Sequence, residues 1–429
     1  MSTPTGKARA GRRRRQRLDR KHVVGLPQLR LIEGMLGTLR AAYDHPNRQL
    51  FYDDLVIGLL LAFYNPVVRS LRGVEDASQM PGIRQHLDIT AIKRSTASDA
   101  MAVFDAQLLV PLIQQLRGQV TSQQIDATDD TLRDLLNRLL AFDGSYFRTA
   151  ADVSWALRER HGSNARLRGR VRLNLHLSVR QGLATGVSIA GQDDPGEPTA
   201  LLDHVEAGQI VVADRGCFSH ETVDQLLGRK VDFVLRLQRG VKCQVIAERS
   251  LTPEDQDAPG SSILSDQTVL LTGAKNRYPP TPLRLVTIQP QSDSGREPGP
   301  AAPSASPIRL LTSVADEPVA AWMIGHLYRR RWDIELFFRW LKCCARWEHL
   351  LSESRNGMLM QIYIAIIGTL LLAVATGRQP DSYSFRLMCL VAAGQGSVED
   401  ALAIYQRRCA ERDRDRQRRR QRQAENQST

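Results

Sequence analysis

Two short apolar runs in this chain each end at an aspartate, and a glycine follows within two residues. Residues 139 to 142 lead to Asp143-Gly144, and residues 210 to 213 lead to Asp214-Arg215-Gly216. Such runs, bounded by turn residues, are typical of buried strands, and ligands bind where the strands of an α/β sheet end. A strand-end aspartate alone more often forms a turn or caps a helix. Together the two predict an α/β sheet with two carboxylates at one edge.

The residues between and after these aspartates predict the rest of the sheet. Apolar and polar residues alternate at positions 171 to 180, which predicts a strand with one apolar face. A third strand is expected at residues 187 to 190. A helix at residues 200 to 206 then crosses over to the strand that ends at Asp214, and a later strand is expected at residues 233 to 237. The expected order is therefore three antiparallel strands followed by a fourth after a helical crossover.

A third acidic residue lies in a segment with helical periodicity. Tyr328, Arg331, Glu335 and Lys342 are separated by two, three and six residues. At about 100° per residue they fall in a stripe roughly 60° wide on one helix. Apolar residues occupy the other sides, which predicts a buried helix, and a buried carboxylate needs a compensating charge or a metal ion. A solvated face with helical ion pairs is the alternative.

With Asp143, Asp214 and Glu335 in this order, the chain resembles the DDE transposases of the insertion-sequence-four family. The third catalytic acid of that family lies in a Tyr-Arg-Glu-Lys signature with the spacing found here, and the Asp-Arg-Gly context of Asp214 also matches. The resemblance covers residues 135 to 375. It implies an α/β fold with an RNase H-like mixed-sheet catalytic domain, a β-rich insertion and a preceding helical DNA-binding domain.

The resemblance also implies that the three acids are catalytic and hold two divalent metal ions. Asp143 would be shared by both ions, while Asp214 and Glu335 would each complete one site. Two such ions can activate water or a DNA 3′-hydroxyl and stabilise the leaving oxygen of a phosphodiester. Hard carboxylate oxygens suit Mg²⁺, with Mn²⁺ as a substitute.

Four further residues of the helical segment are expected to contact DNA near the cut. Tyr328, Arg331 and Lys342 would hold the DNA backbone, the arginine through two parallel donors. Arg339 projects close to the same stripe and would add positive charge. Helix packing and plain surface charge are the alternative roles of Tyr328 and Lys342.

Residues 239 to 318 are too many for an ordinary loop and coincide with the β-rich insertion of the family. Three apolar segments predict strands, at residues 269 to 271, 283 to 287 and 308 to 311. A stretch rich in Pro, Ser and Gly, at residues 289 to 307, predicts a flexible loop. Many members of the family cut the second strand through a DNA hairpin, which requires a flipped base to stack on an aromatic residue. This insertion has no tryptophan, so Tyr278 is the hypothesised stacking residue, with a strand-end anchor as its alternative role.

Residues 26 to 125 show the apolar periodicity of helices. One helix is expected around Leu55 and Leu59, and another from Ser95, its proposed N-cap, through residue 112. Lys93 and Arg94 lie at the positive end of that second helix, which suits a phosphate. The arrangement resembles a helix-turn-helix reader of DNA ends, and a helical packing domain without base contacts is the alternative.

The net charge of +12 and the pI near 9.7 indicate a polyanionic partner, and the charge is concentrated at the two ends. Residues 7 to 21 hold nine Lys or Arg and one acid, and residues 407 to 422 hold nine Arg and three acids. Both segments are poor in apolar residues and are expected to stay disordered until they meet phosphates. Solvated tails without a specific role are the alternative.

The remaining features bound the cellular setting. Six cysteines show no Cys-x-x-Cys pair, which predicts reduced thiols in a cytosolic protein. The family resemblance implies a cytoplasmic, nucleoid-associated bacterial protein. The basic N-terminus lacks the apolar core of a secretory signal. The apolar run at residues 358 to 376 is interrupted by polar residues and predicts a core helix rather than a membrane span.

These patterns lead to one preferred interpretation and two alternatives. The preferred one is a cut-and-paste DNA transposase that binds terminal inverted repeats as a homodimer, cleaves the ends and transfers the 3′ ends to double-stranded target DNA. A structure-specific nuclease without strand transfer and a degenerate transposase acting as a DNA-binding regulator are the alternatives. The expected domains begin with a basic tail at residues 1–25 and a helical DNA-binding domain at 26–125. A catalytic domain in two parts, 135–238 and 319–400, is expected to enclose the insertion at 239–318, and a second basic tail is expected at 401–429.

Overall fold

The computed structural model divides the chain into two compact units. The helical unit comprises Met1–Leu116, Tyr363–Thr376 and Pro380–Thr429, and the sheet unit comprises Arg117–Ile362 and Gly377–Gln379. The residues that the structure describes are 32–43, 48–120, 129–149, 153–159, 168–256, 261–273, 281–290, 306–316, 318–344 and 350–427. The basic segment at 7 to 21, Tyr278 and most of the expected loop at 289 to 307 lie outside these residues.

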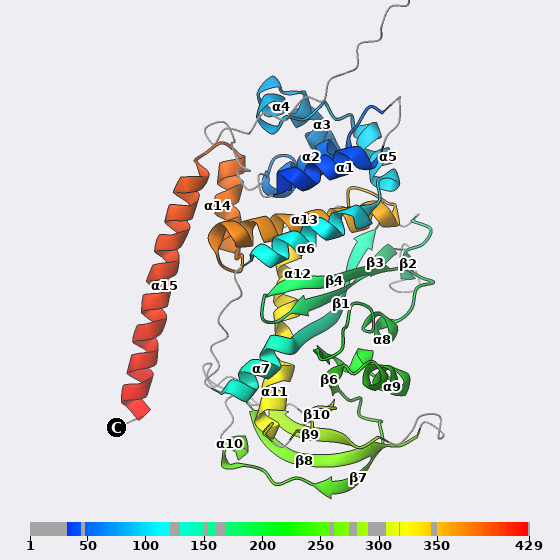
Figure 1. Cartoon of the computed structure of the whole chain (residues 1–429), viewed down its shortest axis with the longest axis vertical. Coiled ribbons are helices and arrows are strands. Elements are labelled where there is room, and N and C mark those ends of the chain that lie inside the picture. The colour runs from blue at the N-terminus through cyan, green and yellow to red at the C-terminus, as the bar shows by residue number, and fades with distance from the viewer. Residues whose placement is uncertain are drawn as a thin grey trace, which may run out of the picture. The chain divides into compact units, whose positions relative to one another are not determined.

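The sheet unit is built on one ten-stranded mixed sheet (Figure 1). The strand order is β2-β3-β1-β5-β6-β10-β9-β8-β7, with β4 also paired to β3. The strands are β1 (Leu139–Thr149), β2 (Leu157–Glu159), β3 (Arg168–Ser178), β4 (Leu183–Ala190), β5 (Ile210–Ala213), β6 (Asp232–Arg236), β7 (Cys243–Glu248), β8 (Ser261–Leu271), β9 (Leu283–Pro290) and β10 (Ile308–Thr312).

The first half of this sheet has the expected strand order. β3 pairs antiparallel with both β1 and β4, and β5 pairs parallel with β1 and with β6. The alternating run predicted at 171 to 180 forms most of β3, and its apolar side chains are buried. A mixed α/β sheet of this order fits the RNase H-like catalytic domain that the family resemblance implies.

The inserted strands extend the same sheet. β10 pairs antiparallel with β6, and β9, β8 and β7 follow in an antiparallel series. One buried cluster includes Phe142 and Phe233 from the first half together with Leu285 and Leu311 from the inserted strands. Burial of apolar surface therefore ties the insertion to the strands that carry Asp143 and Asp214.

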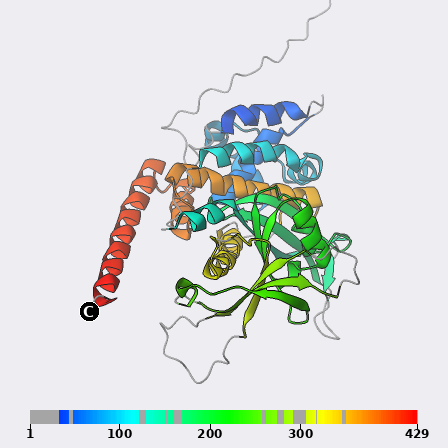
Figure 2. The ribbon, with the colours of Figure 1, turned by 60° about the horizontal axis from the view of Figure 1, so that its bottom comes forward.

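Helices connect and cover the strands of the sheet unit. They are α7 (Asp130–Arg138), α8 (Glu197–Ala200), η3 (Arg215–Cys217), α9 (His220–Gly228), α10 (Pro253–Gln256), α11 (Ala321–Arg329), α12 (Trp332–Cys344) and the first part of α13 (Arg355–Thr376). α11 contacts β5, β6 and the inserted strands β8 to β10, while α12 contacts β1 and β3. Figure 2 shows α11 and α12, in yellow, beside the green strands.

The predicted single helix from 328 to 342 is wrong, because the chain turns between α11 and α12. The amide of Arg331 donates to the carbonyl of Tyr328 at 3.1 Å, and Ile334 donates to Arg331 at 3.2 Å. Bonds to the third preceding residue tighten the turn and shift the directions of the side chains. The prediction that apolar residues bury α12 on all other sides also fails, since Trp332 and Leu336 are 49 % and 46 % exposed.

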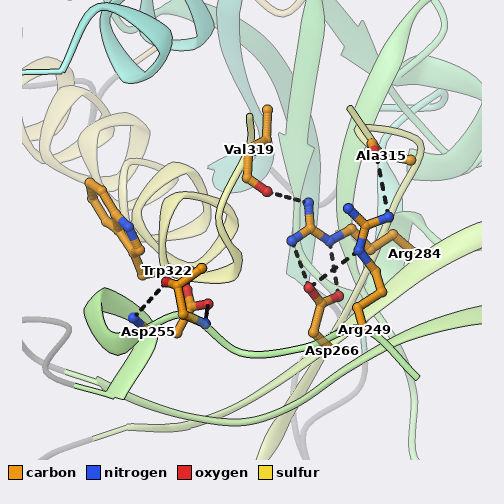
Figure 3. Close-up of polar contacts among 8 residues, drawn as sticks. Arg249, Asp255, Asp266, Arg284, Ala315, Val319 and Trp322 are labelled. Atoms are coloured by element: carbon orange, nitrogen blue, oxygen red, sulfur yellow. Dashed lines mark hydrogen bonds and ion pairs between the residues drawn. The ribbon is translucent and has the colours of Figure 1, made fainter. Parts of the chain in front are cut away.

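A buried ion cluster joins the inserted strands to the segment before α11 (Figure 3). Arg284 of β9 donates to both carboxylate oxygens of Asp266 of β8, at 2.9 and 2.7 Å, and to the carbonyl of Val319 at 2.7 Å. Asp255 of α10 accepts the amide of Trp322 at 2.7 Å. The cluster holds the start of α11 against the inserted strands. Because Arg284 and Asp266 are only 2 % and 3 % exposed, removal of either side chain would leave a buried charge without its partner and destabilise the fold.

The helical unit contains α1 (Glu33–Ala42), α2 (Tyr52–Tyr64), α3 (Leu71–Gln79), α4 (Pro81–Leu87), α5 (Arg94–Val103), η2 (Ala106–Leu109), α6 (Val110–Gln119), the end of α13, α14 (Ser382–Ala392) and α15 (Val398–Gln427). The last three residues of α6 and the first eight residues of α13 belong to the sheet unit. The helix expected around Leu55 and Leu59 is α2, and both side chains are buried.

Three expectations for this unit are wrong. The helix expected from Ser95 through residue 112 is broken, because Asp105 caps η2 by accepting the amide of Gln107 at 2.9 Å. Lys93 rather than Ser95 is at the N-cap position of α5. The C-terminal basic segment, expected to be disordered, lies in the 30-residue helix α15, where Arg412 pairs with Asp381 at 3.0 Å.

α13 is the one helix among the described residues that is long and apolar enough to cross a membrane. Most of its apolar stretch is buried inside the protein, which fits the core helix that the sequence predicts.

Candidate active site

The sheet brings Asp143 and Asp214 to one place. The parallel pairing of β1 with β5 ends at Ala141 and Val212, and each aspartate lies two residues beyond that last pair. Asp214 directly follows β5, as expected. Asp143, however, lies inside β1 and not at its end, because β1 continues to pair with β3 as far as Thr149. The two carboxylates therefore lie just past the point where β5 stops pairing with β1, while β3 continues to pair with β1.

Side chains from α11, α12 and the turn between them reach both aspartates. The hydroxyl of Tyr328 donates to Oδ1 of Asp214 at 3.2 Å. Arg331 pairs through Nη1 with Oδ2 of Asp143 at 3.5 Å and through Nη2 with Oε1 of Glu335 at 2.8 Å. Arg331 thus links the first acid to the third, and Tyr328 links the second acid to the same helical segment.

Lys342 closes the same group of side chains at the far end of α12. Its Nζ atom donates to the hydroxyl of Ser145 at 2.7 Å and lies 5.1 Å from the centroid of the Phe147 ring. Ser145 and Phe147 follow Asp143 along β1. Tyr328, Arg331, Glu335 and Lys342, here called the signature residues, therefore all contact the group around the two aspartates or one another.

Burial and charge perturb the ionisable groups of this site. Burial raises the pKa of Asp143 from its ordinary value of 3.8 to about 6, although the charge of Arg331 and the amide of Gly144 act in the opposite direction. Burial also raises the pKa of the Tyr328 hydroxyl, and the charge of Asp214 adds to this increase. Burial lowers the pKa of Lys342. Perturbed groups gathered around one strand end are typical of functional sites.

The acids are not arranged as a finished metal site. Within the described ranges, no three His, Cys, Asp or Glu side chains lie close enough to hold one metal ion as they stand. The guanidinium of Arg331 instead lies between Asp143 and Glu335 and serves as their cation. The donors are nevertheless hard carboxylate oxygens of the kind that Mg²⁺ prefers. The residues fit a divalent cation provided that Arg331 moves toward another anion.

A pocket of about 290 Å³ opens beside the signature residues. Tyr328, Arg331 and the exposed Trp332 line one side of it, and Ile288 and Ile308 of the inserted strands line another. Its walls are therefore both apolar and cationic, a combination that suits the sugar and base of a nucleotide beside a phosphate.

The other residues predicted to contact DNA lie elsewhere. Arg339 is exposed on α12. Lys93 and Arg94 are exposed at the start of α5 in the helical unit. Tyr278 lies outside the described residues.

Two charged residues of the site were missed by reasoning from the sequence. Arg236, at the end of β6, pairs with Oδ1 of Asp214 at 3.5 Å. Glu197, the first residue of α8, lies against Gly144 and Gly216. The position of Arg236 at a strand end next to the Asp214 strand was a usable signal. Glu197 follows Asp-Asp-Pro-Gly and is followed by Pro198, so it resembles the start of an ordinary short helix.

Comparisons with known proteins agree on one family. The model of the transposase DDE domain matches residues 125–371. A protein of Sinorhizobium fredii named as a transposase is 29 % identical over 171 residues, which are 40 % of this chain and 44 % of that protein. A protein of Geobacillus stearothermophilus, named as a transposase for an insertion sequence element, is 27 % identical over 166 residues, 39 % of each chain.

A third protein, from Synechocystis and also named as a transposase for an insertion sequence element, is 23 % identical over 200 residues, 46 % of this chain and 50 % of its own length. The chain thus spans half or less of the length of these three relatives. Among solved structures, a piggyBac transposase synaptic complex with hairpin DNA aligns with a TM-score of 0.39 and 9 % identity, over 90 % of this chain and 79 % of that one.

Proposed function

The chain belongs to the transposase DDE domain family, and from this premise we propose that it is a cut-and-paste DNA transposase of the insertion-sequence-four type. It binds the terminal inverted repeats of its element, cleaves the ends and transfers the 3′ ends to target DNA. The observation that carries the proposal is the link that Arg331 makes between Asp143 and Glu335, next to the link from Tyr328 to Asp214. Three acids far apart in sequence are thereby gathered by the residues of the Tyr-Arg-Glu-Lys signature.

Asp143, Asp214 and Glu335 are the residues that would hold two divalent cations, Mg²⁺ or Mn²⁺. When bound, such ions activate the attacking oxygen and stabilise the leaving oxygen of a phosphodiester. Arg331 is now paired with two carboxylates and has planar, two-pronged donors that also match a phosphate. We expect it to transfer from these acids to the DNA backbone as the cations bind.

The other signature residues hold their neighbours in place. The Tyr328 hydroxyl donates a hydrogen bond to Asp214, and its raised pKa keeps the hydroxyl in the neutral, donating form. Lys342 lies beside Ser145, two residues past Asp143, where it can contact a phosphate close to the scissile one. Arg339, exposed on the same helix, adds a further contact.

The helical unit supplies the remaining DNA contacts in this proposal. Lys93 and Arg94 are exposed at the start of α5, where the helix dipole favours an anion. α15 presents exposed arginines along a helix that has few apolar residues. A protein that pairs two ends of one element acts as at least a dimer on DNA, so we expect a homodimer.

Strand transfer distinguishes this proposal from a nuclease that cannot join strands. The DNA flanking the coding region is first searched for inverted repeats a few tens of base pairs long. A labelled duplex of one repeat, pre-cut to expose its 3′-hydroxyl, is then incubated with the full chain, Mg²⁺ and a supercoiled plasmid. We expect labelled DNA joined to the plasmid, and none from a matched duplex that ends in a dideoxynucleotide. Nicking of the uncut repeat without joining of the pre-cut one would identify the nuclease instead.

A further inference from the structure

The second half of β1 has a free edge beside the acids. The parallel pairing of β5 with β1 ends at Ala141, whereas the antiparallel pairing of β3 with β1 continues to Thr149. Among the described strands, only β3 therefore pairs with β1 from residue 142 to residue 149. Because successive side chains of a strand point to opposite faces, a molecule that lies along such an edge meets side chains from both faces.

One face of this edge already belongs to the candidate active site. Asp143, Ser145 and Phe147 alternate along β1, so their side chains lie on the same face of the strand. Lys342 of α12 contacts both Ser145 and Phe147. A DNA strand that leaves the acids toward Lys342 thus follows β1 toward its end at Thr149.

The opposite face of the same edge carries arginines and a tyrosine. Tyr146 is 42 % exposed, and Arg148 is exposed as well. On the neighbouring strand, Arg172 is directly opposite Tyr146. Arg170 is directly opposite Arg148, and its guanidinium carbon lies 4.3 Å from the centroid of the Tyr146 ring. These four residues are here called the edge platform.

The edge platform gathers three positive charges on one face of two strands. Arg148 and Arg170 are directly opposite each other, an arrangement of like charges that costs stability in a sheet. Arg172 donates to the side-chain oxygen of Asn174 at 2.8 Å and to the carbonyl of Pro195 at 2.6 Å, and both acceptors are uncharged. Among the described residues, neither Arg148 nor Arg172 forms an ion pair with a carboxylate. A polyanion bound to this face would offset the repulsion.

We propose that the edge platform binds the backbone of the element-end duplex whose scissile phosphate lies at the acids. Arginine matches phosphate oxygens with two parallel donors, and the Tyr146 ring holds the Arg170 guanidinium by stacking. Arg148 is five residues beyond Asp143, or about 17 Å along the strand, which corresponds to about five base pairs of duplex. This inference rests on the proposed function, because it requires an element end at the acids.

Binding of a labelled duplex of one repeat and its flank, measured at several salt concentrations, tests the edge platform without a cleavage readout. Arg148→Gln should reduce the slope of log affinity against log salt by about 0.9, because one phosphate contact is lost. Its thermal unfolding midpoint should equal or exceed that of the wild type, because a like charge opposite Arg170 is removed. The matched control is Arg180→Gln, an exposed arginine just past the end of β3 that is remote from Arg170, and it should keep the wild-type slope.

Uncharged linkages in the DNA locate the contact. Methylphosphonates are placed one at a time about four to six base pairs from the cut, on either side of it. At the contacted phosphate, the uncharged linkage should weaken binding by the wild type and have no further effect on Arg148→Gln.

A second pair of variants tests the stacking. Tyr146→Ala removes the ring beside Arg170 and should weaken binding of the same duplex. Tyr146→Phe keeps a ring at this position and should bind as the wild type does.

Three outcomes would contradict the inference. If Arg148→Gln keeps the wild-type slope and Tyr146→Ala the wild-type affinity, while the wild type joins the pre-cut repeat to the plasmid, the inference is overturned and the proposed function stands. Variants that bind the repeat normally but join less of it to the plasmid would place target DNA on the edge platform instead. A wild type that neither prefers the repeat over an unrelated duplex nor joins strands would overturn both.

Discussion

Asp143→Asn is expected to stabilise the metal-free protein at alkaline pH. Burial raises the pKa of Asp143 from 3.8 to about 6, so the ionised carboxylate costs folding free energy. The stabilisation that the bound proton provides is fully present below pH 3.8 and is lost as the pH rises through about 6. Asparagine has nearly the same shape and no charge, so it avoids this cost at every pH.

The structure sets the size of the effect. The difference between 3.8 and about 6, at about 1.36 kcal/mol per pH unit, corresponds to about 3 kcal/mol. The Asp143 side chain is 26 % exposed, and Arg331 loses one of its two acidic partners in the variant. We therefore expect a gain of about 1 to 2 kcal/mol at pH 8, or a few degrees in the unfolding midpoint of a unit of this size.

Thermal unfolding in EDTA at pH 8 and at pH 5 measures this gain. At pH 5 the folded carboxyl keeps its proton while most of the unfolded chain has lost it, so the gain should shrink to about half of its value at pH 8. Added Mg²⁺ should raise the midpoint of the wild type at pH 8 and leave that of Asp143→Asn nearly unchanged. Asp203→Asn, on the exposed segment after α8, is the control and should show no pH-dependent difference. A variant that is less stable than the wild type at pH 8, or that differs from it equally at both pH values, would show that the ionised Asp143 carboxylate does not destabilise the folded protein.

Three further outcomes are expected. Arg284→Met should lower the free energy of unfolding, measured by denaturant titration, by about 3 to 5 kcal/mol, because it leaves Asp266 buried without its main partner. Adding Asp266→Leu should restore much of the loss, and equal losses in the single and double variants would show that the pairing does not contribute to stability. Deletion of residues 7 to 21 should flatten the slope of log affinity for DNA against log salt by about 0.9 for each phosphate that this segment neutralises, and an unchanged slope would show that its charge is not used. If a hairpin step occurs, Tyr278→Ala should reduce hairpin formation and leave the first nick unchanged. If Trp332→Ala reduces hairpin formation and Tyr278→Ala does not, the stacking residue is Trp332, the exposed tryptophan beside the pocket.

Residue patterns were sufficient to predict the first half of the sheet and the meeting of its two aspartates, but not that the inserted strands extend the same sheet. The alternation in β3 and the apolar runs before Asp143 and Asp214 reflect burial of one or both faces of a strand, which local sequence records directly. The continuation of β1 past Asp143 depends on pairing with β3, whose register a single strand does not reveal.

Other features depend on contacts between distant residues. The turn between α11 and α12 lies within a stretch that has ordinary helical periodicity, so its tightened hydrogen bonds leave no clear pattern in the sequence. The position of Glu197 depends on space left by Gly144 and Gly216, two residues that belong to other strand ends. The order in α15 was missed because composition alone favoured a disordered tail, whereas the Arg412 pair with Asp381 is visible only in the folded chain.

Cleavage of an element end by the wild type and by three isosteric variants tests whether the three acids carry out the reaction. A labelled duplex carrying one inverted repeat and its flank is incubated with Mg²⁺ and with the wild type, Asp143→Asn, Asp214→Asn or Glu335→Gln, and binding of the same duplex is measured in parallel. We expect a metal-dependent nick at the end of the repeat for the wild type, and no nick but nearly unchanged binding for each variant. Substantial cleavage by all three variants would show that these acids are not the catalytic residues.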